Sequence, residues 1–388
     1  MIEGILSDTK IVQLDSLTAC ELDEIINYTS PDNGKVCFVC DNNPLDFREA
    51  LVNEYKKIRD ICLVDKVYPD PKVQDIMDMV NEVKNEQIST VIGIGGGSTL
   101  DSAKAVALTL SNGGDLDDYL GPNPSRKIEN KKVKLILIPT TAGTGAEVTK
   151  FGVYSARSGR KYTLANPLMQ ADVAVLVSEF TYKLPASITA ATAFDALSHA
   201  LEALWNNNAT DVSDIAATEA AVSVLEYMDG AYDDAVNGEK NARTKMLEAS
   251  CRAGIAFNMT GTAAVHALSF IFSEEWHIPH GTACAFTLED IMLLNMKNDK
   301  AKQKLLKVAG RIFSDETDDN RLLDKLYNHI VSLKKKFHLP MKLSDLNISM
   351  LEKDIKPFFN KSLDDPKMWN NILPVNEDIV YGVIKNKL

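Results

Sequence analysis

The sequence predicts an α/β domain built on a largely parallel sheet, followed by an all-helical domain. In the first half, short runs rich in β-branched residues alternate with longer helical patterns, which is typical of βαβ units. From about Pro185 onward the strand-like runs disappear and helical periodicity dominates. The chain has 388 residues, and a single apolar core stops growing efficiently beyond roughly 250–300 residues. We therefore expect two domains, residues 1–183 and 184–388.

The elements of the first domain are expected where apolar residues follow a strand or a helix pattern. The clearest strands are Val36–Cys40, Ile61–Val64, Thr90–Ile94 and Leu135–Ile138, and the clearest helices between them are Val73–Asn85 and Leu100–Leu110. In the second half, helices should break near Asn206–Asn208, Asn258–Gly261 and His338–Pro340. The Lys334–Lys336 triplet is interpreted as the solvated face of a helix.

Composition narrows the classes of partner. The formal net charge of −12 disfavours nucleic acid or an anionic membrane as a partner. No apolar run approaches the roughly 20 residues that span a bilayer, and Met1–Lys10 lacks the pattern of a signal peptide. The six cysteines are scattered, and the pair Cys37 and Cys40 lies in a strand-like run, so we expect core thiols rather than disulfides. A soluble, cytoplasmic protein is expected.

A glycine-rich segment follows the expected strand Thr90–Ile94 and precedes a helix. It consists of Gly95, Gly96, Gly97 and Ser98. Glycines let the backbone approach a pyrophosphate closely, and the free amides at a helix N-terminus stabilise its negative charge. The spacing is not G-x-G-x-x-G, so a plain tight turn stays the alternative.

Two further positions lie where ligands bind in open α/β sheets, at the carboxyl ends of strands. The loop after Leu135–Ile138 offers three hydroxyls for phosphate or ribose oxygens, those of Thr140, Thr141 and Thr144. Asp41 ends the strand Val36–Cys40, where a carboxylate can accept hydrogen bonds from a ribose and repel a 2′-phosphate. This favours NAD over NADP. Local turn capping is the alternative at both places.

A carboxylate and three imidazoles form a candidate metal-binding set. The segment Phe194–Leu204 reads as one amphipathic helix that places Asp195, His199 and Glu202 on one face. Asp195 and His199 can reach one ion, although a hydrogen-bonded pair is the alternative. Downstream, His266 and His280 flank a mostly apolar segment. Together these residues make a four-ligand set of nitrogen and oxygen donors for Zn²⁺ or Fe²⁺.

These motifs together resemble the iron-containing (group III) alcohol dehydrogenases. The matching stretches are Gly95–Lys104, Pro139–Thr149, Asp195–Glu202 and His266–Gly281. The resemblance implies a dinucleotide-binding α/β domain, an all-helical metal-binding domain, the fold shared with dehydroquinate synthase, and a homodimer or larger assembly. It also implies metal ligands at Asp195, His199, His266 and His280, with Fe²⁺ expected and Zn²⁺ the alternative. Cofactor contacts are implied at Asp41, Gly95–Ser98, Asp101, Thr140, Thr141, Thr144 and Lys161.

The sequence departs from the family pattern at two places. Many members have a histidine four residues after the position of His266, where this chain has Phe270. They also often carry an asparagine at the position of Phe151. With aromatic residues at both places, the chain resembles the branch of the family that contains phosphonoacetaldehyde reductases. That branch usually has a basic residue where this chain has Gly261, so a neutral and an anionic substrate both stay open.

The predicted activity is reversible hydride transfer between NAD(H) and a small primary alcohol or aldehyde, with NADP the alternative cofactor. The metal ion acts as a Lewis acid on the substrate oxygen. Because Phe270 cannot titrate, the proton passes through water, a ribose hydroxyl or His277. Phe151, Phe270 and Trp276 are expected to line an apolar pocket, and the candidates for an anionic substrate tail are Lys150, Arg157, Arg160 and Arg252. A dehydroquinate synthase-like lyase and a non-catalytic nucleotide sensor are the rival hypotheses.

Overall fold

A computed structural model describes residues 9–29, 34–42, 45–237 and 240–388. Most of the segment Met1–Lys10, on which the signal-peptide expectation depends, therefore lies outside the described residues. The chain divides into two compact units. The first comprises the residues up to Thr141 together with Gly145–Thr181, and the second comprises Ala142–Thr144 and Tyr182–Leu388.

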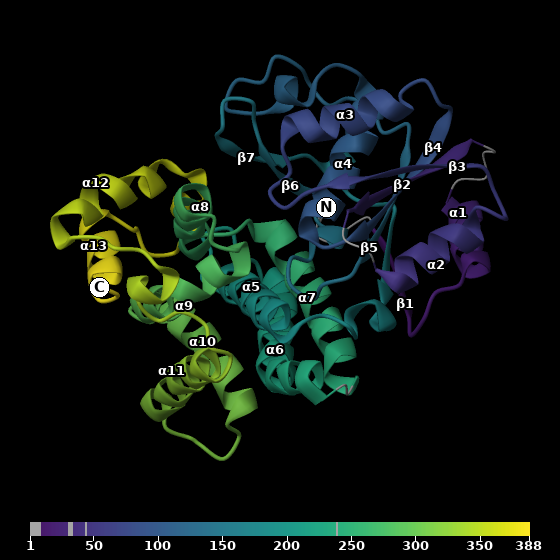
Figure 1. The fold of residues 1–388 in the computed structure, drawn as a ribbon. Coiled ribbons are helices and arrows are strands. Elements are labelled where there is room, and N and C mark those ends of the chain that lie inside the picture. The colour runs from purple at the N-terminus through teal and green to yellow at the C-terminus, as the bar shows by residue number, and fades with distance from the viewer. Residues whose placement is uncertain (1–8, 30–33, 43–44, 238–239) are drawn as a thin grey trace. The chain divides into compact units, whose positions relative to one another are not determined.

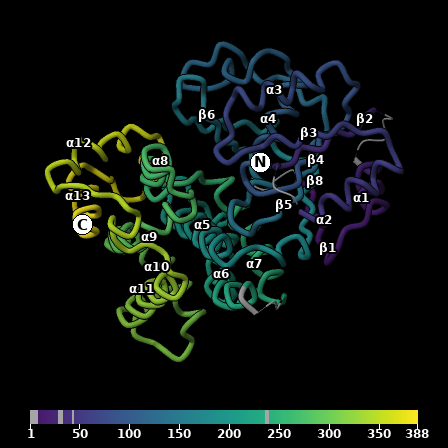
Figure 2. Tube along the Cα trace, in the orientation of Figure 1, coloured from purple at the N-terminus to yellow at the C-terminus, as the bar shows by residue number. Residues whose placement is uncertain are grey.

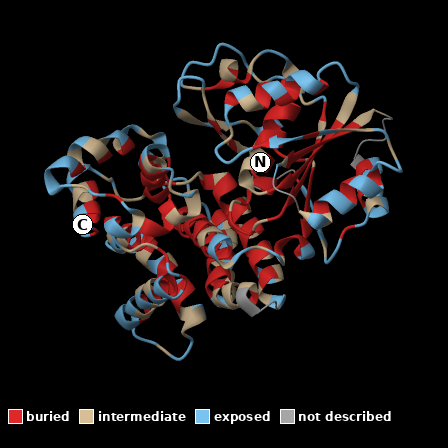
Figure 3. Ribbon diagram, in the orientation of Figure 1, coloured by how far each residue is buried: buried red, intermediate tan, exposed pale blue. Residues whose placement is uncertain are grey.

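The first unit contains a six-stranded sheet in the order β1-β8-β5-β4-β2-β3. Its strands are β1 Lys10–Leu14, β2 Lys35–Asp41, β3 Ile61–Val67, β4 Ile88–Gly95, β5 Lys134–Pro139 and β8 Val173–Val177. Strands β1 to β5 are labelled in Figure 1. All pairings in the sheet are parallel, which confirms the predicted sheet. Figure 3 shows its central strands in the colour of buried residues. Parallel strands buried on both faces read as nearly continuous apolar runs, which is why β2, β4 and β5 were predictable.

Helices cover both faces of this sheet. They are α1 Ala19–Thr29, α2 Asp46–Tyr55, α3 Val73–Val83 and α4 Gly97–Asn112. Cys37 and Val39 of β2 belong to the core under α3 and α4, and Phe38 and Cys40 to the core under α1 and α2. Because successive side chains of a strand point to opposite faces, the two cysteines lie on different sides of the sheet. The prediction that they are core residues is confirmed, and burial raises the pKa of each thiol to about 12.

An antiparallel hairpin completes the first unit and was not predicted. It pairs β6 Phe151–Ser155 with β7 Lys161–Ala165. Short 3-10 turns, η1 Leu116–Tyr119, η2 Ala146–Val148, η3 Pro167–Met169 and η4 Ser178–Thr181, link the elements of this region.

The second unit is helical, and no strand occurs among its described residues. Its helices are α5 Ala186–Leu204, α6 Asp211–Asn237, α7 Asn241–Thr260, α8 Ala264–Trp276, α9 His280–Asn295, α10 Asp299–Ile312, α11 Asp319–Lys336, α12 Ile355–Phe359 and α13 Glu377–Lys385. Helices α5 to α13 are labelled along the trace in Figure 2. Short 3-10 turns, η5 Leu343–Leu346, η6 Glu352–Asp354, η7 Asn360–Asp364 and η8 Pro366–Asn370, lie between α11 and α13. Helix α5 is the central helix of this unit and packs against α6, α7 and α9. The predicted helix breaks are confirmed by the ends of α5, α7 and α11.

The expected solvated face at Lys334–Lys336 is wrong for its first residue. Lys334 is fully buried, and its ammonium lies 2.6 Å from a carboxylate oxygen of Glu289 on α9. Lys387 binds the same carboxylate at 3.0 Å. Burial lowers the pKa of Lys334 to about 8, although Glu289 opposes this shift. A run of lysines in the sequence does not reveal that one of them, Lys334, forms an ion pair with the buried carboxylate of Glu289.

Among the described residues, no single helix is both long and apolar enough to cross a membrane. Helices α7 and α8 meet the length and composition criteria only as a pair, and this pair is bent by 105°.

Candidate functional site

Nitrogen donors of the second unit gather around one oxygen of Asp195. Oδ1 of Asp195 lies 3.5 Å from Nε2 of His266, 3.7 Å from Nε2 of His280 and 3.9 Å from Nδ1 of His199. Ligand bonds of about 2.0–2.2 Å at tetrahedral angles place neighbouring ligand atoms roughly 3.3–3.6 Å apart. The arrangement therefore has the dimensions of a site for one cation.

Three helices supply these side chains. Asp195 and His199 lie on successive turns of α5, His266 lies in the first turn of α8, and His280 is the first residue of α9. The start of α9 comes very close to α5, because a Cβ atom on Gly281 would lie 2.2 Å from the carbonyl oxygen of Ala191. Glycine at this position therefore allows His280 to reach the Asp195 carboxylate.

Hydrogen bonds fix the orientation of two imidazole rings. Nδ1 of His199 donates to the carbonyl of Gly143 at 3.3 Å, and Nδ1 of His266 contacts the Glu202 carboxylate. Such contacts at one ring nitrogen leave the other nitrogen for a metal ion. Nε2 of His266 and Oδ1 of Asp195 are buried and have no hydrogen-bond partner. Since buried polar atoms are normally satisfied, these two atoms fit ligands of a cation.

Glu202 connects α5 to the start of α8. Its side chain is fully buried and accepts hydrogen bonds from the backbone amides of Ala263, Val265 and His266 at 3.0, 2.6 and 3.3 Å. An anion at a helix N-terminus is stabilised by the helix dipole. Burial opposes ionisation of Glu202, but the His266 ring and these amides hold the pKa of the carboxyl below its usual value. The sequence placed Glu202 on the correct helix face without assigning it this role.

Two members of the cluster carry the charge that metal binding requires, whereas neighbouring acidic groups outweigh burial and raise the pKa of His266 and His280, whose protons an ion would displace. Burial is the largest single influence on Asp195 and raises its pKa, but His199, His280 and His266 together outweigh burial and hold the pKa of this carboxyl well below its usual value. Burial lowers the pKa of His199 to about 4, which keeps this ring neutral near pH 7. A metal ligand must be deprotonated, as a neutral imidazole and a carboxylate are.

One further donor was missed by the sequence reasoning. The thiol of Cys284 lies one turn after His280 on α9, with Sγ 3.8 Å from Nε2 of His280. In the described part of the chain, Asp195, His266, His280 and Cys284 each offer a donor atom, and these atoms all lie within 4.8 Å of one another. His199 is not a member of this group. The i, i+4 spacing of His280 and Cys284 was the signal in the sequence.

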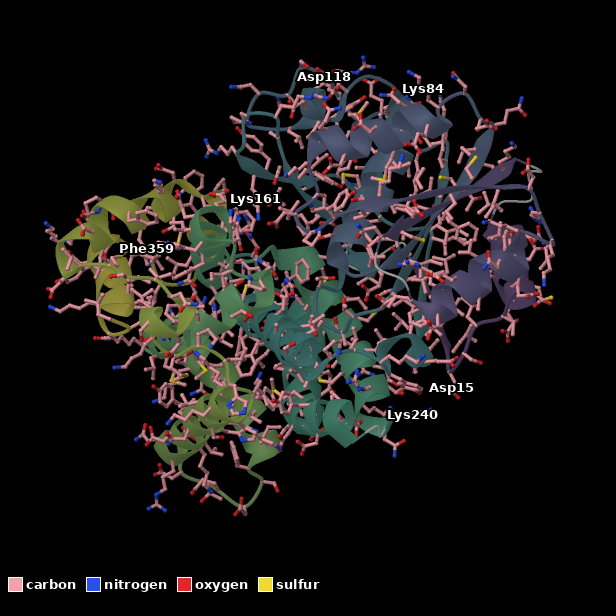
Figure 4. The ribbon with its side chains drawn as sticks, viewed as in Figure 1. Asp15, Lys84, Asp118, Lys161, Lys240 and Phe359 are labelled. Atoms are coloured by element: carbon pink, nitrogen blue, oxygen red, sulfur yellow. The ribbon has the colours of Figure 1, made fainter. Side chains whose placement is uncertain are left out.

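The expected aromatic pocket wall is only partly brought together. The ring centroid of Phe270 lies 6.3 Å from that of His280, and Nζ of Lys367 lies 3.8 Å from the Phe270 centroid. Trp276 stacks instead on Phe358 at 4.8 Å, in an aromatic cluster that includes Phe359, labelled in Figure 4. Phe151 begins β6 of the first unit. His277 is exposed and has a positive φ of 54° at the end of α8.

The glycine-rich loop lies at the point where the strand order of the sheet reverses. Strands β2 and β4 are neighbours in the sheet. The strand that follows β2 in the chain, β3, lies on the far side of β2, and the strand that follows β4, β5, lies on the far side of β4, so the order reverses between β2 and β4. Open α/β sheets bind ligands at this point, outside the carboxyl ends of the strands. Gly95 ends β4 and its carbonyl accepts from the Thr140 amide at 3.0 Å, and α4 begins at Gly97. The loop thus leads directly into the N-terminus of a 16-residue helix.

Asp41 lies at the same edge of the sheet, at the end of β2. Its carboxylate accepts hydrogen bonds from Arg48 at 3.1 Å and from the Thr99 hydroxyl at 3.4 Å. Arg48 was not singled out in the sequence, because its partner is seven residues away and belongs to a different element.

Other predicted cofactor contacts have structural partners within the first unit. Asp101 accepts from the Val153 amide at 2.9 Å, which attaches the β6–β7 hairpin to α4. Lys161, labelled in Figure 4, pairs with Asp70 at 2.7 Å. Thr144 belongs to the short stretch that groups with the second unit.

The candidates for holding an anionic tail also have partners. Arg157 binds Asp115 through both terminal nitrogens at 2.7 and 2.8 Å, and Arg252 pairs with Glu248 at 3.2 Å. Lys150 and Arg160 each lie 5.4 Å from an aromatic centroid, those of Phe151 and Tyr162.

Comparison with known proteins gives matches over nearly the whole chain. A family model described as iron-containing alcohol dehydrogenase matches residues 18–178, and the model of the C-terminal part of the Fe-containing alcohol dehydrogenase family matches residues 189–388. Alcohol dehydrogenase 4 of Saccharomyces cerevisiae is 31% identical over 326 residues, which cover 84% of this chain and 82% of the relative. NAD-dependent methanol dehydrogenase of Bacillus methanolicus is 30% identical over 334 residues, with 85% of each chain covered. The crystal structure of sulfoacetaldehyde reductase from Bifidobacterium kashiwanohense with NAD⁺ superposes with a TM-score of 0.87 at 28% identity, covering 100% of this chain and 99% of the other.

Proposed function

The chain belongs to the iron-containing alcohol dehydrogenase family, and we propose that it transfers hydride between NAD(H) and a small primary alcohol or aldehyde. The observation that carries this proposal is the cluster around Asp195, in which Nε2 of His266 and Nε2 of His280 lie 3.5 and 3.7 Å from one carboxylate oxygen, and the His199 ring stacks on that of His266. The family match in both halves of the chain favours a dehydrogenase over a dehydroquinate synthase-like lyase or a nucleotide sensor.

We assign Asp195, His199, His266 and His280 as the residues that hold a divalent cation, Fe²⁺ or Zn²⁺. When bound, such an ion supplies Lewis-acid stabilisation of negative charge on the substrate oxygen. The ionised Asp195 offsets part of the charge of the ion. Gly143 and Glu202 keep the rings of His199 and His266 in the orientation that ligation requires.

We assign the cofactor to the switch point of the sheet. The amides of Gly95, Gly96, Gly97 and Ser98 at the start of α4 would bind the pyrophosphate, with Thr140 and Thr141 of the same unit as further donors. Asp41 would accept hydrogen bonds from the adenosine ribose, which favours NAD. Its partner Arg48 is a group that can accommodate a 2′-phosphate, so the preference for NAD over NADP depends on this ion pair.

The metal assignment is tested with Asp195→Asn, which keeps the shape of the side chain and removes its charge. We expect kcat/KM for propanal, measured anaerobically with added Fe²⁺ or Zn²⁺, to fall by about a thousandfold, since metal ions supply several kcal/mol of transition-state stabilisation. NADH binding should stay intact. Asp229→Asn on α6 serves as the control. Full activity of Asp195→Asn would refute the assignment.

An anionic aldehyde is the second candidate substrate, and a specific observation favours it. The ammonium of Lys367 lies over Phe270, the aromatic beside His280, and pairs with Asp365 at 3.2 Å. A cation at this place could bind a sulfonate or phosphonate tail. Lys367→Met should then lower kcat/KM for sulfoacetaldehyde and phosphonoacetaldehyde at least tenfold while leaving that for propanal unchanged. Equal effects on all three aldehydes would leave the neutral substrate as the better assignment.

His277 would relay the proton to solvent. A His277→Asn variant with an unchanged pH–rate profile would exclude this role.

All six cysteines are free thiols, which supports a reducing, cytoplasmic location. We expect a homodimer or a larger homo-oligomer, which light scattering on the purified protein would measure.

A further inference from the structure

We infer that the thiolate of Cys284 is a ligand of the cation in this site, which makes the centre a mixed nitrogen, oxygen and sulfur site. The inference rests on the metal centre proposed above and extends its donor set. Cys284 lies on the inner side of α9, fully buried, and its donor atom belongs to the same compact group as those of Asp195, His266 and His280.

The distances fit ligation of one ion. A metal–sulfur bond of about 2.3 Å and a metal–nitrogen bond of about 2.1 Å place sulfur and nitrogen roughly 3.1–3.8 Å apart at the angles of about 90–120° between neighbouring ligands of a five-coordinate ion. The observed distance from Sγ of Cys284 to Nε2 of His280 is 3.8 Å. The distances from Asp195 to His266 and His280, 3.5 and 3.7 Å, meet the same requirement.

Unsatisfied polar atoms provide a second, independent observation. Oδ1 of Asp195 and Nε2 of His266 are buried and make no hydrogen bond, although both belong to the group that includes the Cys284 thiol. A weak S–H···N hydrogen bond from Cys284 to His280 would leave both atoms unsatisfied. A shared cation satisfies them together, which favours coordination over hydrogen bonding.

The arrangement follows from the helix that carries it. His280 and Cys284 are four residues apart, so they lie on the same face of α9, one turn after the other. Gly281 lets the first turn of this helix approach the backbone of α5, where Asp195 is located. The close approach that brings His280 to Asp195 therefore also brings Cys284 there.

A thiolate ligand changes which ions the centre prefers. Thiolates favour Zn²⁺ and Co²⁺, whereas Mg²⁺ and Mn²⁺ prefer oxygen ligands. On binding, the S–H proton passes to solvent and a metal–sulfur bond forms, with no change in oxidation state.

Cobalt substitution tests the inference without reference to activity. The full-length protein is stripped with a chelator and titrated anaerobically with Co²⁺, while absorption is recorded in the visible and near-ultraviolet. Visible d–d bands report a bound low-coordinate ion, and a near-ultraviolet charge-transfer band reports a thiolate ligand. We expect both in the wild type. Cys284→Ser should lose the charge-transfer band and keep the d–d bands, whereas Cys251→Ser, which changes a buried thiol of α7, should keep both.

The outcomes separate this inference from the proposed metal centre. Visible bands without the charge-transfer band in the wild type would overturn the role of Cys284 and leave the centre intact. No Co²⁺ bound in equilibrium dialysis would overturn the centre itself. Both readings use the wild-type protein and do not depend on the folding of a variant. If Cys284→Ser is folded by circular dichroism, its Zn²⁺ affinity should be weaker by about ten- to a hundredfold.

Discussion

At the scale of single residues, Glu202 makes two kinds of contact at the start of α8. It accepts hydrogen bonds from the backbone amides of Ala263 and Val265, and it contacts the ring of His266. Replacing it with glutamine keeps an acceptor oxygen but removes the charge that the ring and the helix N-terminus stabilise. The carboxylate thus affects metal affinity through a residue it orients, without being a ligand itself.

We predict that Glu202→Gln weakens Zn²⁺ binding by about ten- to a hundredfold, the range observed when a group that supports a metal ligand is removed. Competition with a chromophoric chelator measures the affinity. Glu275→Gln, an exposed residue on the same helix as His266, is the control and should bind normally. Unchanged Zn²⁺ affinity in Glu202→Gln would show that His266 does not depend on the carboxylate.

Glu147 gives a prediction about pH. It is almost fully buried, one of its carboxylate oxygens has no partner, and burial raises the pKa of the carboxyl to about 7. Since the folded state holds this proton above the pH at which the unfolded chain releases it, stability falls as pH rises from about 4.5 through 7. The loss amounts to at most roughly 3 kcal/mol.

Glu147→Gln should remove the loss of folding stability that ionisation of this buried carboxyl causes. The variant should therefore gain stability relative to the wild type at pH 8 and much less at pH 5. Thermal unfolding at the two pH values measures the difference. A stability difference between variant and wild type that is the same at both pH values would contradict the raised pKa.

At the scale of elements, the packing of α9 against α5 depends on glycine, which has no side chain, at position 281. A Cβ atom on Gly281 would meet the Ala191 carbonyl at 2.2 Å, whereas one on Gly310 of α10 would meet nothing within 4 Å. Gly281→Ala should therefore push α9 away, destabilise the protein by about 1–3 kcal/mol and weaken metal binding. Gly310→Ala should instead stabilise it by about 0.4–1 kcal/mol. Denaturant titrations measure the free energy of unfolding of the two variants. Equal changes in this free energy would contradict the close packing of α9 against α5 at Gly281.

Elements differed in how well the sequence predicted them. The strands β2, β4 and β5 are buried on both faces and read as apolar runs. The edge strand β1 has mostly exposed residues and a weak pattern, and the edge strand β3 was recognised from its apolar start, Ile61–Val64. The hairpin β6–β7 contains Gly152, whose Cβ would clash with Tyr154 at 2.2 Å, and a glycine in a short strand weakens the signal. Helix α5 was expected to be amphipathic, yet its second half is buried all round, because α6, α7 and α9 cover it.

The candidate site was predictable where its residues share a helix or a motif. Asp195 and His199 were found by helical spacing, and the separate positions of His266 and His280 by counting donors. Cys284 was missed because cysteines were examined only for disulfides and C-x-x-C pairs. Arg48 and Lys334 were missed because their partners are set by tertiary packing, which no local pattern encodes.

At the scale of the whole molecule, the two kinds of proposed ligand belong to different compact units. A ligand that binds only the folded state stabilises it by about 2.7 kcal/mol at a hundred times its Kd. We predict that Zn²⁺ slows hydrogen exchange mainly in α5, α8 and α9, and that NADH slows it mainly in residues 95–98 and α4. Mass spectrometry of peptides localises these effects. Protection of the same peptides by both ligands in separate experiments would contradict the assignment of two sites.

The hydrogen bonds that orient His199 and His266 come from Gly143 and Glu202, which are part of the protein itself. They persist when the ion leaves, so the vacated centre should keep its geometry instead of collapsing. Exchange of one metal for another can then proceed on the folded enzyme. A preparation inactivated by dialysis against a chelator should regain its turnover in one rapid, saturable phase after the cation is returned.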